Sequence, residues 1–275
     1  MADPRPIGIF DSGVGGLTVA RAILDLVPSE PLVYVGDNGR FPYGPRPVGE
    51  IRRFALEIAG YLVGRDVKML VVACNSIEVS AIRDVTDASG LPVVGVIDPG
   101  VRAAVGATKV GRIGMIGTEA TVRSGAYDRA VAKSGARVTL ESRACPAFVQ
   151  FVERGDTSSE ELRHHAIQYL EPLRDAGVDA LILGCTHYPL LSPLISEVMG
   201  PEVVLVSSAQ ETAKDVYATV TANELQRADA GPPHHEFLTT GSTQEFERVA
   251  RVFLGPEIRQ VHAAELQPVG GGRWS

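Results

Sequence analysis

The chain has 275 residues, of which 45% are hydrophobic and 21% charged, and its formal net charge is −7. This composition is ordinary for a globular protein and excludes a disordered or fibrous chain. No basic cluster is present, so we expect no direct binding to nucleic acid. No apolar run approaches the ~18 residues of a membrane helix, and the N-terminus lacks the layout of a signal peptide. We therefore expect a cytoplasmic protein that does not associate with membranes.

Short apolar runs recur along the chain and read as strands that are buried on both faces. They cover residues 6–10, 32–35, 69–73, 92–97, 112–116, 180–183 and 203–206. Helical patterns lie between them, at residues 50–64, 76–88, 158–175 and 209–225. This alternation predicts an α/β fold with largely parallel sheets.

Three segments of the first half recur in the same order in the second half. Residues 7–13 resemble 113–119, residues 69–76 resemble 180–187, and residues 93–96 resemble 203–206. Any two buried strands look alike, so one match alone means little. Three matches at nearly constant spacing predict two similar α/β lobes, the second of which starts near Asp98.

The three cysteines, Cys74, Cys145 and Cys185, form no C-x-x-C pair, so neither a disulfide framework nor a metal site is expected. Cys74 and Cys185 each stand where a buried strand ends and a helix begins, and the repeat pairs them. The free N–H groups at a helix start favour a thiolate, which lowers the pKa of a thiol. The alternative is that both are small buried residues. Cys145 lies outside the repeated pair, so we expect it to be structural.

Other strand ends carry polar groups that suit an anionic ligand. A glycine-rich turn, Asp11 to Gly16, follows the first strand and allows backbone N–H groups to approach an anion. Thr118 and Thr121 follow the equivalent strand of the second half. The turn-rich loop at residues 36–45 is well placed to cover a site, although a plain surface loop is an equal alternative. The turn is not G-x-G-x-x-G, so a nicotinamide site is weakly supported.

Two facing thiols can take a proton from one side of a carbon atom and give one to the other side, which inverts a stereocentre. Asp11 and His187 are neighbours that could tune the two sulfur atoms. Lysines are few and none falls at a strand end, so pyridoxal phosphate chemistry is unsupported.

Five segments together closely resemble the glutamate racemases. They are FDSGVGGLT at residues 10–18, PYG at 42–44, ACNS at 73–76, residues 145–155, and LGCTHYPL at 183–190. The resemblance runs from about Ile7 to Thr212. It implies a racemase that needs no cofactor and makes D-glutamate for peptidoglycan.

The resemblance also implies roles for individual residues. Cys74 would deprotonate D-glutamate with help from Asp11, and Cys185 would deprotonate L-glutamate with help from His187 and Glu153. The residues expected to bind substrate are Asp11, Ser12, Tyr43, Gly44, Asn75, Ser76, Thr118, Thr121, Thr186 and His187.

The family fold implies two lobes related by pseudo-twofold symmetry, with the active site between them. The first lobe would take residues 1–97 and 208–275, and the second residues 98–207. Members of the family are commonly homodimers, and some are reported to bind DNA gyrase, so both are possible partners here.

One position departs from the family pattern. Small residues usually follow the C-N-T/S motif, whereas Ile77 and Glu78 follow Ser76 here. A carboxylate so close to Cys74 could raise the pKa of the thiol, or it could point away from the site. Two rival functions stay open, namely an aspartate racemase or a one-thiol decarboxylase of the same superfamily, and a binding or regulatory protein.

Overall fold

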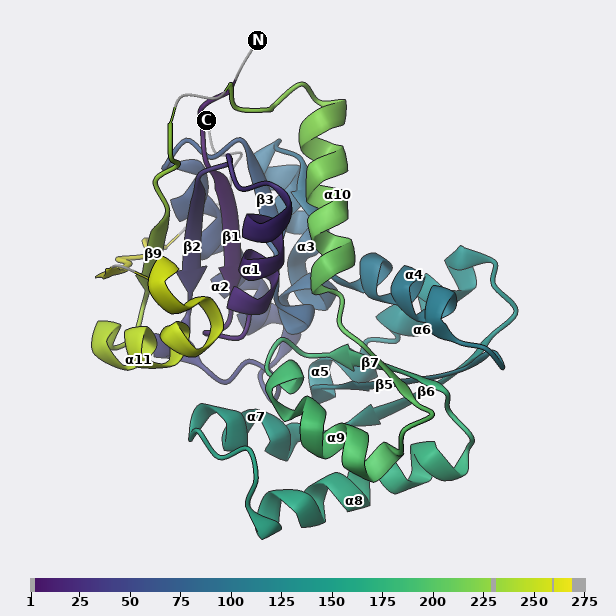
Figure 1. Cartoon of the computed structure of the whole chain (residues 1–275). Coiled ribbons are helices and arrows are strands. Elements are labelled where there is room, and N and C mark those ends of the chain that lie inside the picture. The colour runs from purple at the N-terminus through teal and green to yellow at the C-terminus, as the bar shows by residue number, and fades with distance from the viewer. Residues whose placement is uncertain (1–2, 229–230, 259, 269–275) are drawn as a thin grey trace.

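The computed structural model describes residues 3–228, 231–258 and 260–268, which form two parallel β-sheets flanked by helices (Figure 1). The first sheet has the strand order β10-β9-β2-β1-β3-β4, and the second has the order β6-β5-β7-β8. The strands of the first sheet are β1 (Ile7–Asp11), β2 (Leu32–Gly36), β3 (Met69–Val72), β4 (Val93–Val94), β9 (Glu236–Thr239) and β10 (Val261–Ala263). Those of the second are β5 (Arg112–Gly117), β6 (Thr139–Ala144), β7 (Ala180–Gly184) and β8 (Val204–Val206).

Helices cover both faces of the first sheet. Ile7 and Ile9 face one layer, formed by α1 (Leu17–Leu26), α10 (Ala209–Ala222) and α11 (Thr243–Leu254). Phe10 and its neighbours on the opposite face pack against α2 (Val48–Val63) and α3 (Asn75–Ser89). Because alternate residues of each strand enter two different cores, the strands are apolar along their whole length.

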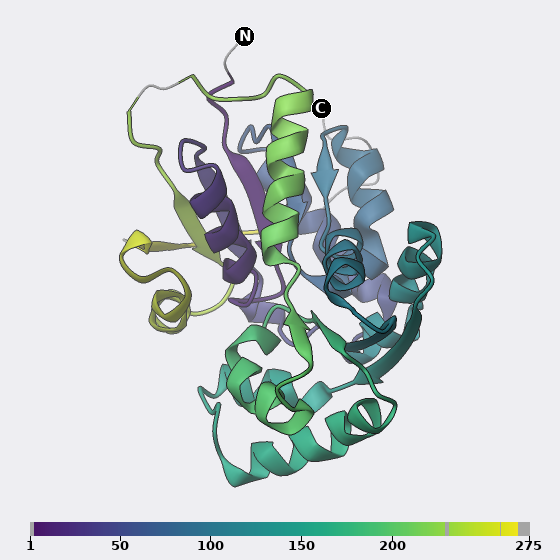
Figure 2. The ribbon, with the colours of Figure 1, turned by 45° about the vertical axis from the view of Figure 1, so that its right-hand side comes forward.

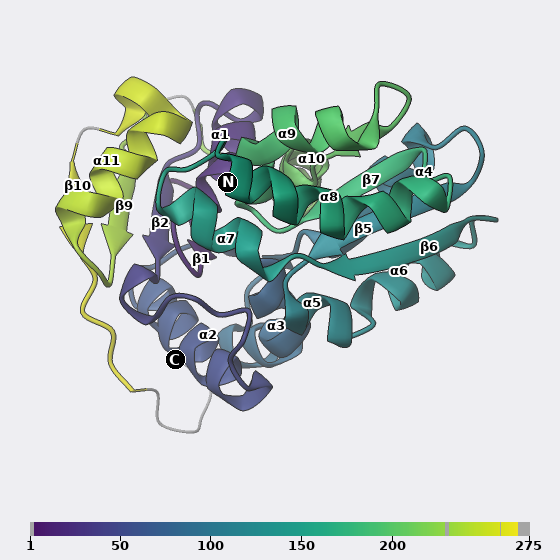
Figure 3. The same ribbon diagram turned by 90° about the horizontal axis from the view of Figure 1, so that it is seen from below.

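The second sheet is covered in the same way. One core packs α4 (Ile97–Ala107) and α6 (Ala126–Ser134) against β5 and β7. The other core joins the sheet to α7 (Pro146–Glu153), α8 (Glu160–Asp175) and α9 (Ser192–Met199), which lie on the opposite side of the sheet from α4 and α6 (Figure 3). The short helix α5 (Glu119–Arg123) follows β5.

The internal repeat corresponds to a repeated topology. The order β2-β1-β3-β4 in the first sheet matches β6-β5-β7-β8 in the second, and the three recurring segments fall on the equivalent pairs β1/β5, β3/β7 and β4/β8. Strands β9 and β10 extend only the first sheet. The α/β fold of two similar lobes is therefore confirmed.

The chain returns to the first lobe after β8. Helix α10 packs against α1 and lies along the first lobe (Figure 2). Strand β9 then pairs with β2, so the last described segments complete the first sheet. The four predicted helices are all present, as α2, α3, α8 and α10.

Some strand predictions were incomplete. The run at 92–97 is a strand only at Val93–Val94, because the N–H groups of Val96 and Ile97 bond the Glu78 carboxylate and Ile97 already begins α4. Strand β6 was missed because its residues alternate between exposed and half-buried and form no apolar run. Strands β9 and β10 were missed as well, and both are short.

Candidate active site

A cavity of ≈ 260 Å³ receives side chains from the carboxyl ends of strands in both lobes, where ligands of open α/β sheets bind. Ser12 and Cys74 follow β1 and β3, and Thr118 and Cys185 follow the equivalent strands β5 and β7. The residues that line the cavity are Ser12, Phe41, Pro42, Tyr43, Gly44, Pro45, Cys74, Asn75, Ser76, Thr118, Glu119, Pro146, Val149, Gln150, Gly184, Cys185, Thr186 and His187. The structure thus brings Cys74 and Cys185, the two cysteines at equivalent positions of the repeat, into one cavity.

Cys74 is the N-cap residue of α3, and its thiol is buried beside Ser12, with 3.4 Å between Sγ and Oγ. Burial, and after it the charge of the nearby Asp11 carboxylate, raise the pKa of this thiol to about 12. The Ser12 hydroxyl and the Ile77 N–H act in the opposite direction but are outweighed. The expected lowering of the Cys74 pKa was therefore wrong, because the helix start is less important here than desolvation.

Alkylation of Cys74 in the free protein should consequently be slow at neutral pH. Because the thiolate is the reactive form and the pKa is about 12, the rate should rise about tenfold per pH unit between pH 7 and 10. Peptide mapping by mass spectrometry after short iodoacetamide pulses would follow Cys74 separately from the other cysteines. A rate that is already constant above pH 8 would contradict the raised pKa.

Cys185 has a different partner. His187 Nδ1 lies 3.8 Å from Cys185 Sγ, and His187 Nε2 lies 2.5 Å from Glu153 Oε1 on α7. Burial disfavours the imidazolium, but hydrogen bonds with Cys185 and Glu153 outweigh it and raise the pKa of His187 to about 10. A buried cation, balanced by a carboxylate, therefore lies beside this sulfur at neutral pH. No α-helix begins directly after Cys185, since the 3-10 turn Tyr188–Leu191 precedes α9.

Asp11 is fully buried at the end of β1 and connects the lobes. Its carboxylate accepts hydrogen bonds from the Gly13 N–H at 3.0 Å and from the Thr186 hydroxyl at 3.3 Å. Burial raises the pKa of Asp11, while the His187 charge and these donors lower it in part. A Cβ atom built on Gly15 would lie 2.5 Å from Thr186 Oγ1, so the glycine-rich turn lets the two lobes approach closely.

Neutral polar groups continue across the cavity. The Ser76 and Thr118 hydroxyl oxygens are 2.9 Å apart, and Thr118 and Thr121 are 3.1 Å apart. Asn75 Oδ1 accepts a hydrogen bond of 2.8 Å from the Tyr127 hydroxyl. Among the described residues that line the cavity none is Lys or Arg, so an anionic ligand would be held by hydroxyl, amide and backbone donors.

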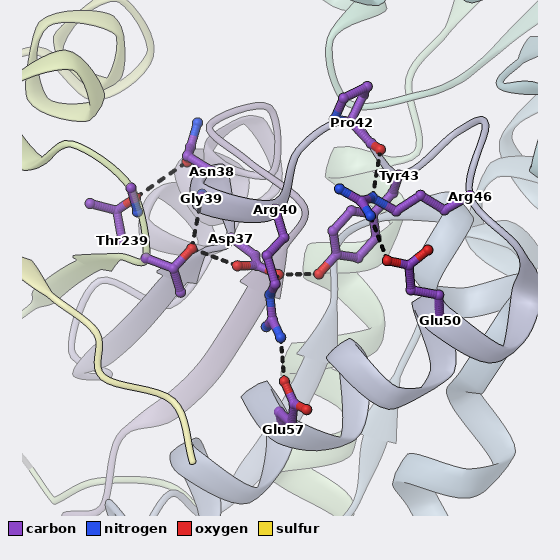
Figure 4. Close-up of polar contacts among 12 residues, drawn as sticks. Asp37, Asn38, Gly39, Arg40, Pro42, Tyr43, Arg46, Glu50, Glu57 and Thr239 are labelled. Carbon is purple, nitrogen blue, oxygen red and sulfur yellow. Dashed lines mark hydrogen bonds and ion pairs between the residues drawn. The ribbon is translucent and has the colours of Figure 1, made fainter. Parts of the chain in front are cut away.

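The loop after β2 closes one side of the cavity and is anchored by Asp37 (Figure 4). The fully buried Asp37 carboxylate accepts hydrogen bonds from the Tyr43 hydroxyl, from Arg40 Nε at 2.7 Å and from the Thr240 hydroxyl at 2.5 Å. Arg40 also pairs with Glu57 of α2. The Tyr43 ring thus lines the cavity while its hydroxyl points to Asp37, which fixes the loop.

Most of the expected site residues line the cavity, whereas three lie behind it. Asp11, Thr121 and Glu153 do not line it but bond Thr186, Thr118 and His187, which do. Sequence reasoning missed Asp37 as the loop anchor and missed Glu119, Val149 and Gln150 of the lining. Val149 and Gln150 belong to the 145–155 segment that resembles the family, but their residue types carry no chemical signal.

Glu78 points away from Cys74. Its carboxylate accepts hydrogen bonds from the Val96 N–H at 2.5 Å and the Ile97 N–H at 3.1 Å, and it does not line the cavity. Of the two alternatives for this residue, the structure supports the one in which it points away.

Cys145 is fully buried but does not line the cavity, so replacing it by alanine should leave turnover intact. Its thiol lies 3.9 Å from the Arg143 carbonyl oxygen, and the Tyr188 hydroxyl donates a hydrogen bond to the Cys145 backbone oxygen. The Cys145→Ala variant should lose about 1 kcal/mol of stability through the small void. Steady-state rates and a thermal melt would check this, and a folded but inactive variant would show that the site is misplaced.

Two thiols from different lobes, each beside an ionisable partner, are the components of a proton-transfer site. One sulfur can act as base and the other as acid toward a ligand held between them. Both sulfurs are largely buried, and the low local dielectric of such a setting strengthens the electrostatic contacts around the reacting atoms.

Comparison with known proteins gives a consistent result. Residues 8–216 match the family model described as Asp/Glu/Hydantoin racemase. A curated glutamate racemase from Parafrankia sp. is 56% identical over 94% of this chain and 94% of its own. The glutamate racemase isoform RacE1 of Bacillus anthracis superposes with a TM-score of 0.89 at 40% identity, covering 97% of this chain and 99% of its own. The Francisella tularensis glutamate racemase, solved in complex with D-glutamate, gives a TM-score of 0.90 at 33% identity, covering 97% of this chain and 100% of its own.

Proposed function

This chain belongs to the Asp/Glu/hydantoin racemase family, and on that premise we propose that Cys74 and Cys185 are its two catalytic acid–base groups. The reaction is the interconversion of L-glutamate and D-glutamate, the activity of the curated relatives. In this family the reaction supplies D-glutamate for peptidoglycan. The observation that carries the assignment is that two buried cysteines from equivalent strands of the two lobes line a single cavity.

The proposed steps move one proton in and one proton out. From L-glutamate, the Cys185 thiolate takes the α-proton and becomes a thiol, while the substrate carbon becomes a carbanion. The Cys74 thiol then gives its proton to the opposite face of that carbon and becomes a thiolate. D-glutamate is processed by the reverse sequence, so each sulfur acts as base in one direction and as acid in the other.

The partners of the two sulfurs suit these roles. The His187 imidazolium, paired with Glu153, stabilises negative charge on Cys185, the base toward L-glutamate. Asp11 and burial keep Cys74 protonated, and therefore ready to act as an acid.

Substrate carboxylates would be bound by the neutral donors around the cavity. Ser12, Asn75, Ser76, Thr118 and Thr186 supply hydroxyl and amide groups. The fixed Tyr43–Gly44 segment would form one wall, and Thr121 would orient Thr118. The complex of the Francisella tularensis relative with D-glutamate supports glutamate as the ligand of this cavity.

The test of this function is an optical assay with purified protein and no added cofactor. L-glutamate should lose its optical rotation completely, and D-glutamate should reach the same end point. L-aspartate serves as the matched competitor, one methylene shorter. Faster racemisation of aspartate than of glutamate, or dependence on an added cofactor, would overturn the proposal.

The same topology supports a proposal for the limits of the two lobes. We place residues 1–97 and 208–275 in the first lobe and 98–207 in the second, which is supported by β4 ending at Val94, β8 ending at Val206, and α10 packing on α1. Residues 1–2, 229–230, 259 and 269–275 lie outside the described part of the chain.

The expected partners and location stay predictions. These are a homodimer, an interaction with DNA gyrase, and a place in the cytoplasm. Within the residues that the structure describes, no helix has the length and apolar character needed to cross a membrane.

A further inference from the structure

Glu78 is the residue that the proposed reaction leaves unexplained. It lies in the first turn of α3, where its own N–H bonds the Cys74 carbonyl at 2.9 Å. Its side chain leaves this turn and reaches the start of α4, at Val96 and Ile97. One side chain thus connects the helix that begins at Cys74 to the segment where the chain crosses from the first sheet to the second.

The crossing segment is shaped to receive this carboxylate. A Cβ atom built on Gly95 would overlap the carboxyl carbon and both oxygens of Glu78, so only glycine fits there without displacing the side chain. The carboxylate accepts hydrogen bonds from the first free N–H groups of α4, which have no partners within the helix itself. Glu78 therefore supplies the cap of α4 from a different helix.

Helix α4 in turn packs against the strand that ends at Cys185. Ile97 and Val101 share a core with Ile182 of β7, three residues before Cys185. A continuous path of packed groups therefore runs from Cys74 through α3, Glu78 and α4 to β7 and Cys185. Two further bonds across the lobes, Asn75 to Tyr127 and Ser76 to Thr118, start from the same turn of α3.

We propose that Glu78 is a positioning residue for racemisation, clamping the first turn of α3 to the start of α4 and so fixing Cys74 relative to Cys185. This inference rests on the proposed two-thiol function. Without the clamp, the lobes should still fold, but the two sulfurs should sample a wider range of separations. Small displacements of reacting groups reduce turnover strongly, whereas the groups that bind the substrate carboxylates are unchanged.

The ionisation of Glu78 makes the strength of the clamp depend on pH. Burial, with a smaller contribution from the charge of Asp98, outweighs the two backbone donors and raises the pKa of Glu78 to about 7. A side chain released into water would have the ordinary, lower pKa, so ionisation favours release and protonation favours the clamped state. The clamp should therefore hold most firmly below the ordinary pKa of a glutamate, loosen as the pH rises from there to about 7, and change little above pH 7.

Several charged groups line the groove beside Glu78 and belong to the three helices around it. They are Arg83 and Asp84 of α3, Asp98 of α4, and Arg129 and Lys133 of α6. Lys133 pairs with Asp98 at 2.6 Å, and both side chains are largely exposed, so their fields are screened. The buried Tyr127 of α6 has its own pKa raised by burial first and by Glu78 second.

The first test compares Glu78→Gln with Glu78→Met at pH 6.5. Glutamine keeps an oxygen acceptor in the same place, whereas methionine has similar length and leaves both N–H groups without a partner. We expect kcat of the methionine variant to fall roughly tenfold in both directions with KM little changed, and the glutamine variant to stay within about twofold of the parent. Asp87→Asn removes an exposed carboxylate from the same helix and is the matched control.

The second readout is the pH profile. The kcat of Glu78→Gln divided by that of the parent should rise as the pH increases toward about 7 and level off above it, because the amide cannot ionise. Asp98→Asn should move this rise to slightly lower pH. A merely structural role would change the melting temperature and leave the ratio flat, and a flat ratio would contradict the clamp.

Hydrogen exchange tests the clamp without any turnover. The Val96 and Ile97 amides should exchange faster in Glu78→Met than in the parent at pH 6.5, and the Asp87→Asn control should match the parent. Equal exchange, or a methionine variant with unchanged kcat, overturns the inference. If the parent itself does not racemise glutamate, the proposed function fails, while the exchange result still decides whether the clamp exists.

Discussion

Replacing Cys74 or Cys185 by serine should abolish racemisation in both directions, with kcat falling by about 10³-fold or more. Each direction needs one sulfur as base and the other as acid, so neither variant retains a complete pair. The serine hydroxyl is nearly isosteric but far too weak an acid to replace a thiol in either role. Polarimetry with each pure enantiomer would measure the loss.

The equilibrium supplies an internal check on this result. The two enantiomers have the same free energy in water, so kcat/KM must be equal in the two directions for the parent and for each variant. Cys145→Ala is the control, since its thiol is also buried but lies outside the cavity lining. Substantial turnover by a folded Cys74→Ser or Cys185→Ser protein would refute the two-thiol mechanism.

The second large effect concerns His187 and Asp11. We expect His187→Asn and Asp11→Asn each to lower kcat/KM roughly 10²-fold. The first change removes the imidazolium beside Cys185, and the second removes the carboxylate that keeps Cys74 in its acid form and accepts the Thr186 hydrogen bond. Because kcat/KM falls equally in both directions, rates alone cannot say which proton transfer has slowed. Primary isotope effects with α-deuterated glutamate can distinguish the two steps.

The isotope effects should change in mirror-image fashion. In His187→Asn, proton transfer at Cys185 becomes the main barrier, so the effect should grow with deuterated L-glutamate and shrink with deuterated D-glutamate. Asp11→Asn should show the reverse, because Cys74 abstracts the proton of the D enantiomer. If both variants change the two effects in the same sense, the assignment of partners to sulfurs is wrong.

The sequence predicted the elements that are defined by local composition. The run at 69–73 is apolar at every position because its residues enter two cores, and Cys74 follows it at the strand end where ligands bind. The repeat predicted that Cys185 lies at the equivalent strand end of the second lobe. Strand β6 lacked this signal because it is an exposed edge strand. The identity of the substrate, glutamate, was predicted from the family resemblance rather than from the chemistry of the residues.

Properties that depend on distant partners could not be predicted. Asp37 anchors the loop through Thr240, more than two hundred residues away, and the direction of Glu78 depends on where the Val96 and Ile97 amides lie. The Cys74 pKa was predicted in the wrong direction, because the helix start is visible in the sequence whereas the burial and the Asp11 charge are not.

The most direct test of the two-thiol account is deuterium uptake at the α-carbon in heavy water, measured early in the reaction of L-glutamate. A thiol carries only one proton, so Cys185 can return to L-glutamate only the proton it took, whereas Cys74 delivers deuterium from the solvent. The account predicts that newly formed D-glutamate carries one α-deuterium while the remaining L-glutamate carries none. Equal deuterium in both enantiomers, or protium retained in the D-glutamate, would contradict proton transfer by two separate thiols.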